Sequence, residues 1–248
     1  MNSLVAIGQF GIFTARVFKG LVLGPRYLDA FFKHTWVVVW RCILPVVAVV
    51  FPFGMVTALQ GLSIFALFGA ERMLASLLSV AVFRELSPVL ASVLVAAQGG
   101  SAFAAELGSM RIREELDATA VMGVDGLAWH VAPRVLALTL ACPILNLIGS
   151  VAGVAGGFFT AVLIKGEQAG IFLSELWSFT DPVDLWGGVL KTTLFGLIIG
   201  LVSTWLGYNA KGGAAGVGEA VNNTVVYSVV LFITANYFLT SAIFGTLG

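Results

Sequence analysis

The fold is decided by the run VLALTLACPILNLIGSVAGVAGGFFTAVLI, residues 135–164, which has no charged side chain over 30 positions. A helix of about 20 residues already crosses the roughly 30 Å hydrocarbon layer of a bilayer. Four further stretches are similar: 42–70, 86–105 and 220–248 lack charges, and 185–210 contains Lys191 alone. The sequence therefore predicts five transmembrane helices, which we place at 42–66, 86–107, 134–164, 185–209 and 221–246.

The composition agrees with a membrane protein. Of the 248 residues, 59% are hydrophobic and 10% are charged, and the formal net charge is zero. A soluble domain has roughly 25% charged residues and about 45–50% apolar ones. These values exclude a water-soluble globular enzyme and a disordered chain, and the zero net charge excludes the basic surface that nucleic-acid binding requires. We expect one all-α integral membrane domain over residues 1–248.

The N-terminal region, residues 1–35, differs from the five spans. Between residues 4 and 23, apolar residues recur at helical spacing and polar residues fall on another face, namely Phe10, Phe13, Val17 and Leu21 against Gln9, Arg16 and Lys19. This pattern predicts a helix that lies in the membrane interface. A sixth, short span is the alternative, and the charges near its middle count against it. Residues 73–83 form either a short external helix or the first half of a long second span.

Basic residues indicate the orientation, because cytoplasmic loops are enriched in them. With the N-terminus in the cytoplasm, nine basic residues lie inside and four outside. The inside set is Arg16, Lys19, Arg26, Lys33, Arg41, Arg111, Arg113, Arg134 and Lys211, and the outside set is Arg72, Arg84, Lys165 and Lys191. We therefore predict a multi-pass membrane protein with a cytoplasmic N-terminus and with residues 165–184 outside.

Motifs for chemistry are absent from the sequence. No Walker A pattern occurs, so this chain is not expected to hold the phosphates of ATP itself. The glycine-rich segment 211–219 is interpreted as a flexible cytoplasmic turn. His34 and His130 are isolated, so we expect no metal and no cofactor. An ion-driven carrier needs ionisable groups deep in the bilayer, and the candidates are few and close to span ends: Arg84, Glu85, Glu106 and Lys191.

Glycines recur at every fourth position in two spans. The third span has Gly149, Gly153 and Gly157, and the fourth has Gly196 and Gly200. Such ridges let helix backbones approach closely. They predict close packing, either within the chain or at a subunit interface.

The most informative polar segment is residues 110–123, between the second and third spans. Arg111 with Glu115, and Arg113 with Asp117, have i,i+4 spacing and can pair along a helix. Ile112, Leu116 and Ala120 form one apolar face, Gly123 stops the helix, and Asp125-Gly126 forms a turn. The pattern predicts a short cytoplasmic helix, which either docks into a groove of a soluble partner or is a solvated loop helix.

The run RELSPVLASVLVAAQGGSAFAAELGSMRIREELDATAVMGVD, residues 84–125, resembles the MlaE/YrbE family of ABC transporter permeases, the membrane subunits of MCE-type lipid transporters. The segments PRVLA (133–137), KGG (211–213), GVGEAV (216–221) and NNTVV (222–226) also match the pattern of that family. Two positions depart from it. Gln98 stands where many members have Arg, and Gly126 follows Asp125 where Pro is common.

The resemblance implies an N-terminal interfacial helix, five spans and several partners. Two permease subunits pair, as two copies or as paralogues, with cytoplasmic ABC ATPases on one side and an MCE-domain lipid-binding protein on the other. The segment that meets the ATPase would be the cytoplasmic coupling helix, with Arg113, Glu114, Glu115, Leu116, Asp117, Met122 and Gly123 as its coupling residues. Lipid would lie in a cavity bordered by the first, second and fifth spans, to which we assign Leu59, Gln98, Ser101 and Tyr237.

The resemblance therefore predicts a permease that moves phospholipid or a related hydrophobic substrate between the inner membrane and the outer envelope. It would not be an enzyme, because ATP would be hydrolysed by a partner chain. Two other functions stay open from the residues alone. One is an ion-driven secondary carrier with Glu85 or Glu106 as the titrating group, and the other is a scaffold subunit that does not transport.

Overall fold

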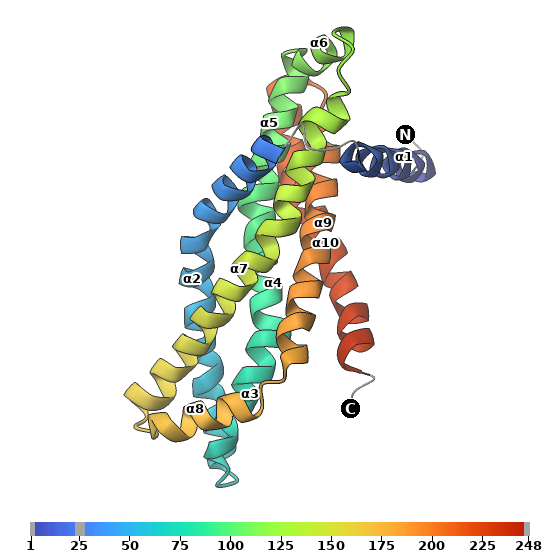
Figure 1. Ribbon diagram of the computed structural model, residues 1–248. Coiled ribbons are helices and arrows are strands. Elements are labelled where there is room, and N and C mark those ends of the chain that lie inside the picture. Colours follow the sequence, from blue (N-terminus) through green and yellow to red (C-terminus); the bar gives the residue numbers. More distant parts are fainter. Residues whose placement is uncertain (1–2, 23–27, 246–248) are drawn as a thin grey trace. The chain divides into compact units, whose positions relative to one another are not determined.

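The computed structural model describes residues 3–22 and 28–245, and within them it contains helices and no strand (Figure 1). The helices are α1 (Ser3–Val22), α2 (Leu28–Ala66), α3 (Leu74–Ala81), α4 (Ser87–Val95), α5 (Ser101–Ile112), α6 (Glu115–Val121), α7 (Ala132–Phe158), α8 (Ala169–Ser178), α9 (Pro182–Tyr208) and α10 (Gly213–Phe244). Shorter segments are the 3-10 helix η2 (Glu71–Met73) and the π-helical turns η3 (Val82–Leu86), η4 (Ala96–Gly100), η5 (Leu127–Val131) and η6 (Phe159–Ile164). Arg26 and residue 246 lie outside the described residues.

Five helices in the described ranges are long and apolar enough to cross a membrane, which confirms the predicted number. They are Leu28–Ala66, Glu71–Ile112, Leu127–Ile164, Pro182–Tyr208 and Gly213–Phe244. A helix satisfies its own backbone hydrogen bonds, as a lipid environment requires. Residues 73–83 are the first half of the second long helix rather than a separate helix. Each of these helices begins before its predicted span, because charges set the predicted limits and a helical backbone continues past a charge. The span limits themselves stay predictions.

The chain divides into two compact units, and parts of the same long helices contribute to both. Unit 1 contains Met1–Arg41, Val95–Ala141 and Leu194–Thr234. Unit 2 contains Cys42–Leu94, Cys142–Thr193 and Ala235–Gly248. Each unit has its own hydrophobic core.

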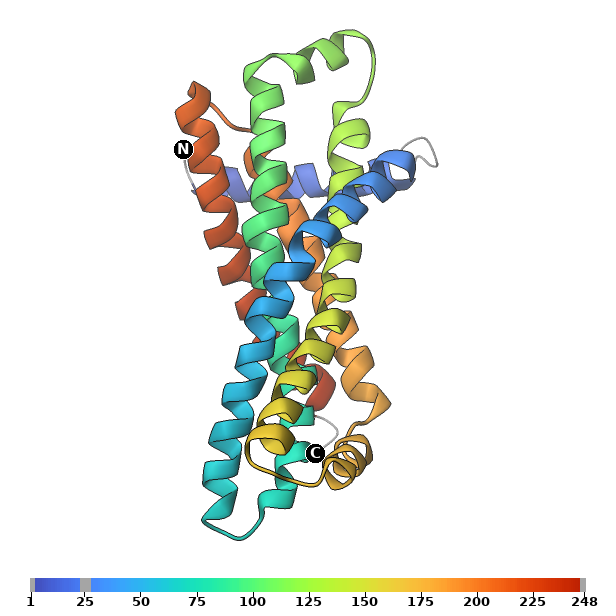
Figure 2. The ribbon, with the colours of Figure 1, turned by 90° about the vertical axis from the view of Figure 1, so that its left-hand side faces the viewer.

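In unit 1, α1 runs crosswise to the neighbouring part of α9 (Figures 1 and 2). Phe13 and Val17 of α1 are buried, whereas Arg16 and Lys19 are exposed. The predicted division of this helix into an apolar and a polar face is therefore confirmed at these positions; the side chain of Leu21 lies outside the part that the structure describes. The core that receives α1 contains Leu107, Val131, Val135 and Leu201, with Phe10, Trp205 and Tyr208 packed against it.

In unit 2, α8 packs against α3 (Figure 1). Phe172 and Leu176 of α8 are buried in a core that also contains Ala58, Leu62, Leu74, Leu78, Val82 and Ala161. From the sequence, residues 165–184 were expected only to form an external segment, and α8 was not predicted. Its apolar face gives the segment a fixed position within unit 2.

The glycine ridges pack within the chain. In unit 2, a Cβ atom on Gly153 would meet Val82 at 2.9 Å and one on Gly149 would meet Ser87 at 2.8 Å. In unit 1, a Cβ atom on Gly200 would lie 3.0 Å from the backbone of Val135. A Cβ atom on Gly54 of α2 would overlap the carbonyl oxygen of Gly153 in α7. These glycines let helix backbones touch, as predicted.

We expect Gly54→Ala to lower the free energy of unfolding by about 1–3 kcal/mol, because its methyl group collides with backbone that cannot move aside. Gly11→Ala is the matched control: a Cβ atom there meets nothing within 4 Å, so alanine should be neutral or stabilise the helix by about 0.5–1 kcal/mol. Thermal unfolding in detergent compares the two. Equal stability of both variants would contradict the close packing of α2 on α7.

Candidate functional site

The segment predicted as one helix over 110–123 is divided in two. The long helix ends with α5 at Ile112, and α6 begins at Glu115. Between them, Glu114 has φ 61°, in the left-handed region. This conformation cannot continue a right-handed helix, so the prediction of a continuous helix is wrong. Figure 2 shows the result, a rising α5, a crosswise α6 and a descending return to η5.

The turn at Glu114 also changes the ion pairs. Arg111 Nη1 lies 2.6 Å from Asp117 Oδ1, and Arg113 Nη1 lies 3.9 Å from Glu115 Oε1. The predicted pairs, Arg111 with Glu115 and Arg113 with Asp117, are wrong because they assumed helical spacing through the turn. The Arg111–Asp117 pair joins the end of α5 to α6. Both of its side chains are well exposed, so it contributes at most about 1 kcal/mol.

The surface of α6 combines acidic and apolar side chains. Leu116 is buried, but Ile112 and Ala120 are exposed, so the predicted apolar face does not form a common core. Val121 and Met122 at the end of α6 are 89% and 70% exposed. Gly123 ends the segment with φ 74°, as expected for a glycine stop. The carboxylate of Asp125 then accepts hydrogen bonds from the amides of Leu127 and Ala128, which starts η5.

A buried ion-pair network lies in unit 2. The side chain of Lys191, on α9, is fully buried, and its ammonium donates to Glu85 Oε1 at 2.9 Å, Thr240 Oγ1 at 2.8 Å and the carbonyl of Arg84 at 2.7 Å. An ammonium has three donors, so all three are used. Glu85 also accepts hydrogen bonds from Thr240 and Asn236 of α10, both at 2.8 Å.

The sequence around Arg84 explains why a lysine fits there. Pro88 has no N–H to donate to the carbonyl of Arg84, four residues earlier in the helix, and Lys191 supplies a donor to that oxygen. The guanidinium of Arg84 pairs with the buried Asp184 at 2.7 Å. The charges of Arg84 and Glu85 are therefore compensated by residues of α9, Asp184 and Lys191, and not by each other.

The second acid named for an ion-driven carrier, Glu106, pairs with Arg134 in unit 1 at 3.3 Å. Arg134 also donates to the carbonyl of His130 at 2.6 Å. Each of the two acids named for an ion-driven carrier thus has a cationic partner. If one of these acids took up a proton during transport, its cationic partner would be left without a compensating charge. These contacts therefore do not favour the carrier hypothesis.

The four residues assigned to a lipid cavity occupy three long helices. Gln98 lies in η4 and Ser101 follows it at the start of α5. Leu59 of α2 and Tyr237 of α10 are 45% and 73% exposed, and Gln98 is also exposed. π-Helical turns such as η4 occur often at functional sites. A common cavity for these side chains stays a prediction.

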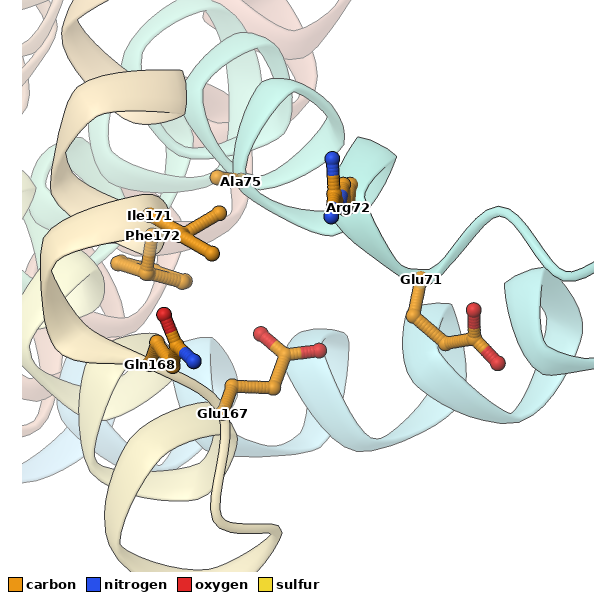
Figure 3. A pocket seen from close by; sticks show the side chains of 7 residues that line it. All are labelled: Glu71, Arg72, Ala75, Glu167, Gln168, Ile171 and Phe172. Carbon is orange, nitrogen blue, oxygen red and sulfur yellow. The ribbon is translucent and has the colours of Figure 1, made fainter.

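A pocket of about 250 Å³ in unit 2 lies between η2 and the start of α8 (Figure 3). Glu167 and Gln168 line it from one side, and Glu71 and Arg72 line it from the other. Partial burial, and then the negative charge of Glu71, raise the pKa of Glu167 above its usual value of 4.5. Because the folded-state pKa is the higher one, protonation of Glu167 stabilises the fold; that stability is complete below about pH 4.5 and is lost as the pH rises through the raised pKa.

Glu71→Gln should lower the pKa of Glu167, because it removes the neighbouring negative charge while burial remains. The expected result is a loss of stability that occurs at lower pH than in the parent, seen as thermal unfolding temperature against pH. Glu175→Gln on α8 removes the same charge away from the pocket lining and serves as the control. An unchanged pH profile in Glu71→Gln would contradict the interaction.

The partners of the buried charges were not predicted from the sequence. Lys191 was visible as the one charge within an apolar run, and a buried cation requires an anion. Its partner Glu85 is 106 positions away, and spacing along a helix carries no information over that distance. The signal that could have found the pair is the occurrence of one lysine in the fourth span and of one acid, three residues before a proline, at the start of the second span.

Comparison with known proteins identifies the family. The family model described as permease MlaE matches residues 31–242. A probable ABC transporter permease protein of Rickettsia bellii is 35% identical over 240 residues, covering 96% of this chain and 92% of the relative. The intermembrane phospholipid transport system permease protein MlaE of Haemophilus influenzae is 32% identical over 197 residues, with 77% and 74% covered.

A chloroplast protein of Arabidopsis thaliana, TRIGALACTOSYLDIACYLGLYCEROL 1, is 36% identical over 195 residues, covering 79% of this chain and 56% of the relative. The matched region contains all five long helices almost completely. Both the resemblance found in the sequence and the all-helical membrane fold are thereby confirmed. The chain is a transporter subunit, not an enzyme, and it belongs to the MlaE permease family.

Proposed function

We propose that this chain is the membrane permease of an ABC transporter that moves phospholipid or a related lipid between the inner membrane and the outer envelope. A separate ATPase would supply the energy. Membership of the permease family and the phospholipid transport system named for the Haemophilus influenzae relative support this proposal. The absence of a Walker A motif from the sequence agrees with ATP hydrolysis on another chain.

The observation that carries the proposal is the surface of α6, which exposes acidic side chains beside apolar ones. Glu115 and Asp117 are 47% and 60% exposed on a helix whose end presents Val121 and Met122 to solvent. An apolar tip beside acidic side chains suits a groove with an apolar floor and a basic rim. We assign this surface to the ATPase, with Arg113, Glu114, Glu115, Leu116, Asp117, Met122 and Gly123 as the coupling residues.

The same proposal fixes the orientation. α6 and the N-terminus would face the cytoplasm, where the excess of basic residues lies, and α1 would lie in the membrane interface. Helix α8 and the C-terminal end of α10 would face outward, toward an MCE-domain protein. A second permease, as a copy or a paralogue, would complete a lipid cavity to which Leu59, Gln98, Ser101 and Tyr237 contribute.

The assembly is tested by gentle purification from native membranes, followed by mass spectrometry of the proteins and lipids that remain bound. We expect an ABC ATPase, an MCE-domain protein and a defined lipid. The permease peptides also show whether one sequence or two related sequences are present. A chain recovered alone with bulk lipid would contradict the proposal and favour the carrier or the scaffold.

A further inference from the structure

A cavity in unit 1 is lined by none of the residues assigned to coupling or to the lipid cavity. It is a cavity of about 630 Å³ between α1, the start of η5 and the end of α9. Its lining residues are Gln9, Ile12, Phe13, Arg16, Leu127, Trp205, Tyr208, Asn209 and Lys211. We propose that this cavity binds the headgroup of an anionic phospholipid of the surrounding membrane.

The charge of the lining favours an anion. Arg16 and Lys211 are both exposed, and no acidic residue lines the cavity. Neither cation belongs to an ion pair that the structure shows between its described residues. Two cations without a carboxylate make a net positive site in a chain whose formal net charge is zero. A phosphate group with net negative charge matches them.

The interfacial position proposed for α1 would put the cavity at headgroup level, and this inference rests on that part of the proposed function. One side of α1 packs on the protein through Phe13 and Val17, but Ile12 and Phe18 are apolar and 58% and 44% exposed. Exposed apolar side chains beside the exposed cations Arg16 and Lys19 suit a helix at a lipid surface, where acyl chains cover the apolar groups and headgroups meet the charges. Trp205 also lines the cavity, and amphipathic aromatic side chains of this kind are enriched at membrane interfaces.

The turn between α9 and α10 holds Lys211 in place. Gly212 and Gly213 have φ 87° and 71°, which glycine adopts without strain. The missing side chain of Gly216 lets the first turn of α10 lie directly against the carbonyl of Lys211. The prediction of a flexible turn over 211–219 is therefore wrong from Gly213 on, because α10 begins there. The close contact at Gly216 holds the backbone of Lys211 against α10, beside the cavity that Arg16 also lines. A bound headgroup would join α1 to this turn.

The test uses the full chain in mild detergent with an equimolar mixture of dioleoyl phosphatidylglycerol and dioleoyl phosphatidylcholine. Native mass spectrometry measures the ratio of the two lipids retained. One basic side chain near an anionic lipid surface is worth about fivefold in binding. We therefore expect the Arg16→Gln, Lys211→Gln double variant to lower the phosphatidylglycerol preference by about 25-fold, and each single variant by about fivefold.

Lys19→Gln, which removes a cation from the same helix but outside the cavity lining, should leave the ratio unchanged. Arg16→Lys with Lys211→Arg keeps both charges and should keep the preference, which separates the charge effect from damage to the fold. A ratio unaffected by the double variant overturns the proposal. Inorganic phosphate is the second probe: phosphate binding without any preference among the lipids would assign the cavity to a soluble anion and overturn the lipid assignment.

Discussion

Lys191→Met is expected to lower the free energy of unfolding by about 3 kcal/mol. Removing one partner of a buried ion pair costs roughly 3–5 kcal/mol, because the other charge is left uncompensated. The lower value applies here since the side chain of Glu85 is 39% exposed, although that of Lys191 is fully buried. The variant also removes the donor to the carbonyl of Arg84, which Pro88 cannot serve.

The double variant Glu85→Gln, Lys191→Met separates charge from packing. The glutamine that replaces Glu85 is neutral, so the cost of an unpaired carboxylate disappears, and we expect a coupling free energy of about 1–3 kcal/mol from the four-variant cycle. Lys165→Met removes an exposed lysine and should change stability by no more than about 0.5 kcal/mol. Unfolding in detergent is the measurement. A cycle without coupling would show that the contact between Lys191 and Glu85 does not stabilise unit 2.

Reversing two charges on α6, Glu115→Lys with Asp117→Lys, should separate the permease from its ATPase. Like charges placed together at an interface cost several kcal/mol, and about 1.4 kcal/mol is already tenfold in affinity. We expect at least about a tenfold loss of co-purified ATPase and a corresponding loss of lipid transport. The fold should survive, because the Arg111–Asp117 pair that is lost is well exposed.

The matched control reverses Glu175 and Asp181 to lysine, on the segment that we place on the outer side of the membrane. The same change in net charge is made there, so a general effect of charge on expression or detergent behaviour would appear in both variants. We expect normal ATPase retention in the control. Normal retention and normal transport in the α6 variant would refute the coupling role.

The sequence predicted the features that depend on short-range patterns. Five apolar runs became five long helices, since a helix in lipid needs little more than length and hydrophobicity. The face of α1 with Phe13 and Val17 followed from helical spacing. The glycine ridge at Gly153 correctly indicated a close helix contact, because a missing side chain has the same consequence whichever helix it faces.

The features that the sequence did not predict depend on single backbone angles or on distant partners. One left-handed residue, Glu114, turned a predicted helix into two and exchanged its ion pairs. Helix α8 lies in a short segment between two spans, and its apolar residues pack in a core with residues of α3 and other distant parts of the chain. The contact of Lys191 with Glu85 joins helices far apart in the chain. The coupling and cavity residues came from the family resemblance and stay predictions.

The central claim is that ATP hydrolysis on a partner drives lipid through this permease. Its most direct test places the purified assembly in proteoliposomes and measures phospholipid transfer with ATP, with a non-hydrolysable ATP analogue, and with a pH gradient alone. The account predicts transfer with ATP only, and its loss in the Glu115→Lys, Asp117→Lys variant. Transfer driven by the pH gradient without ATP, or ATP hydrolysis that moves no lipid, would contradict it.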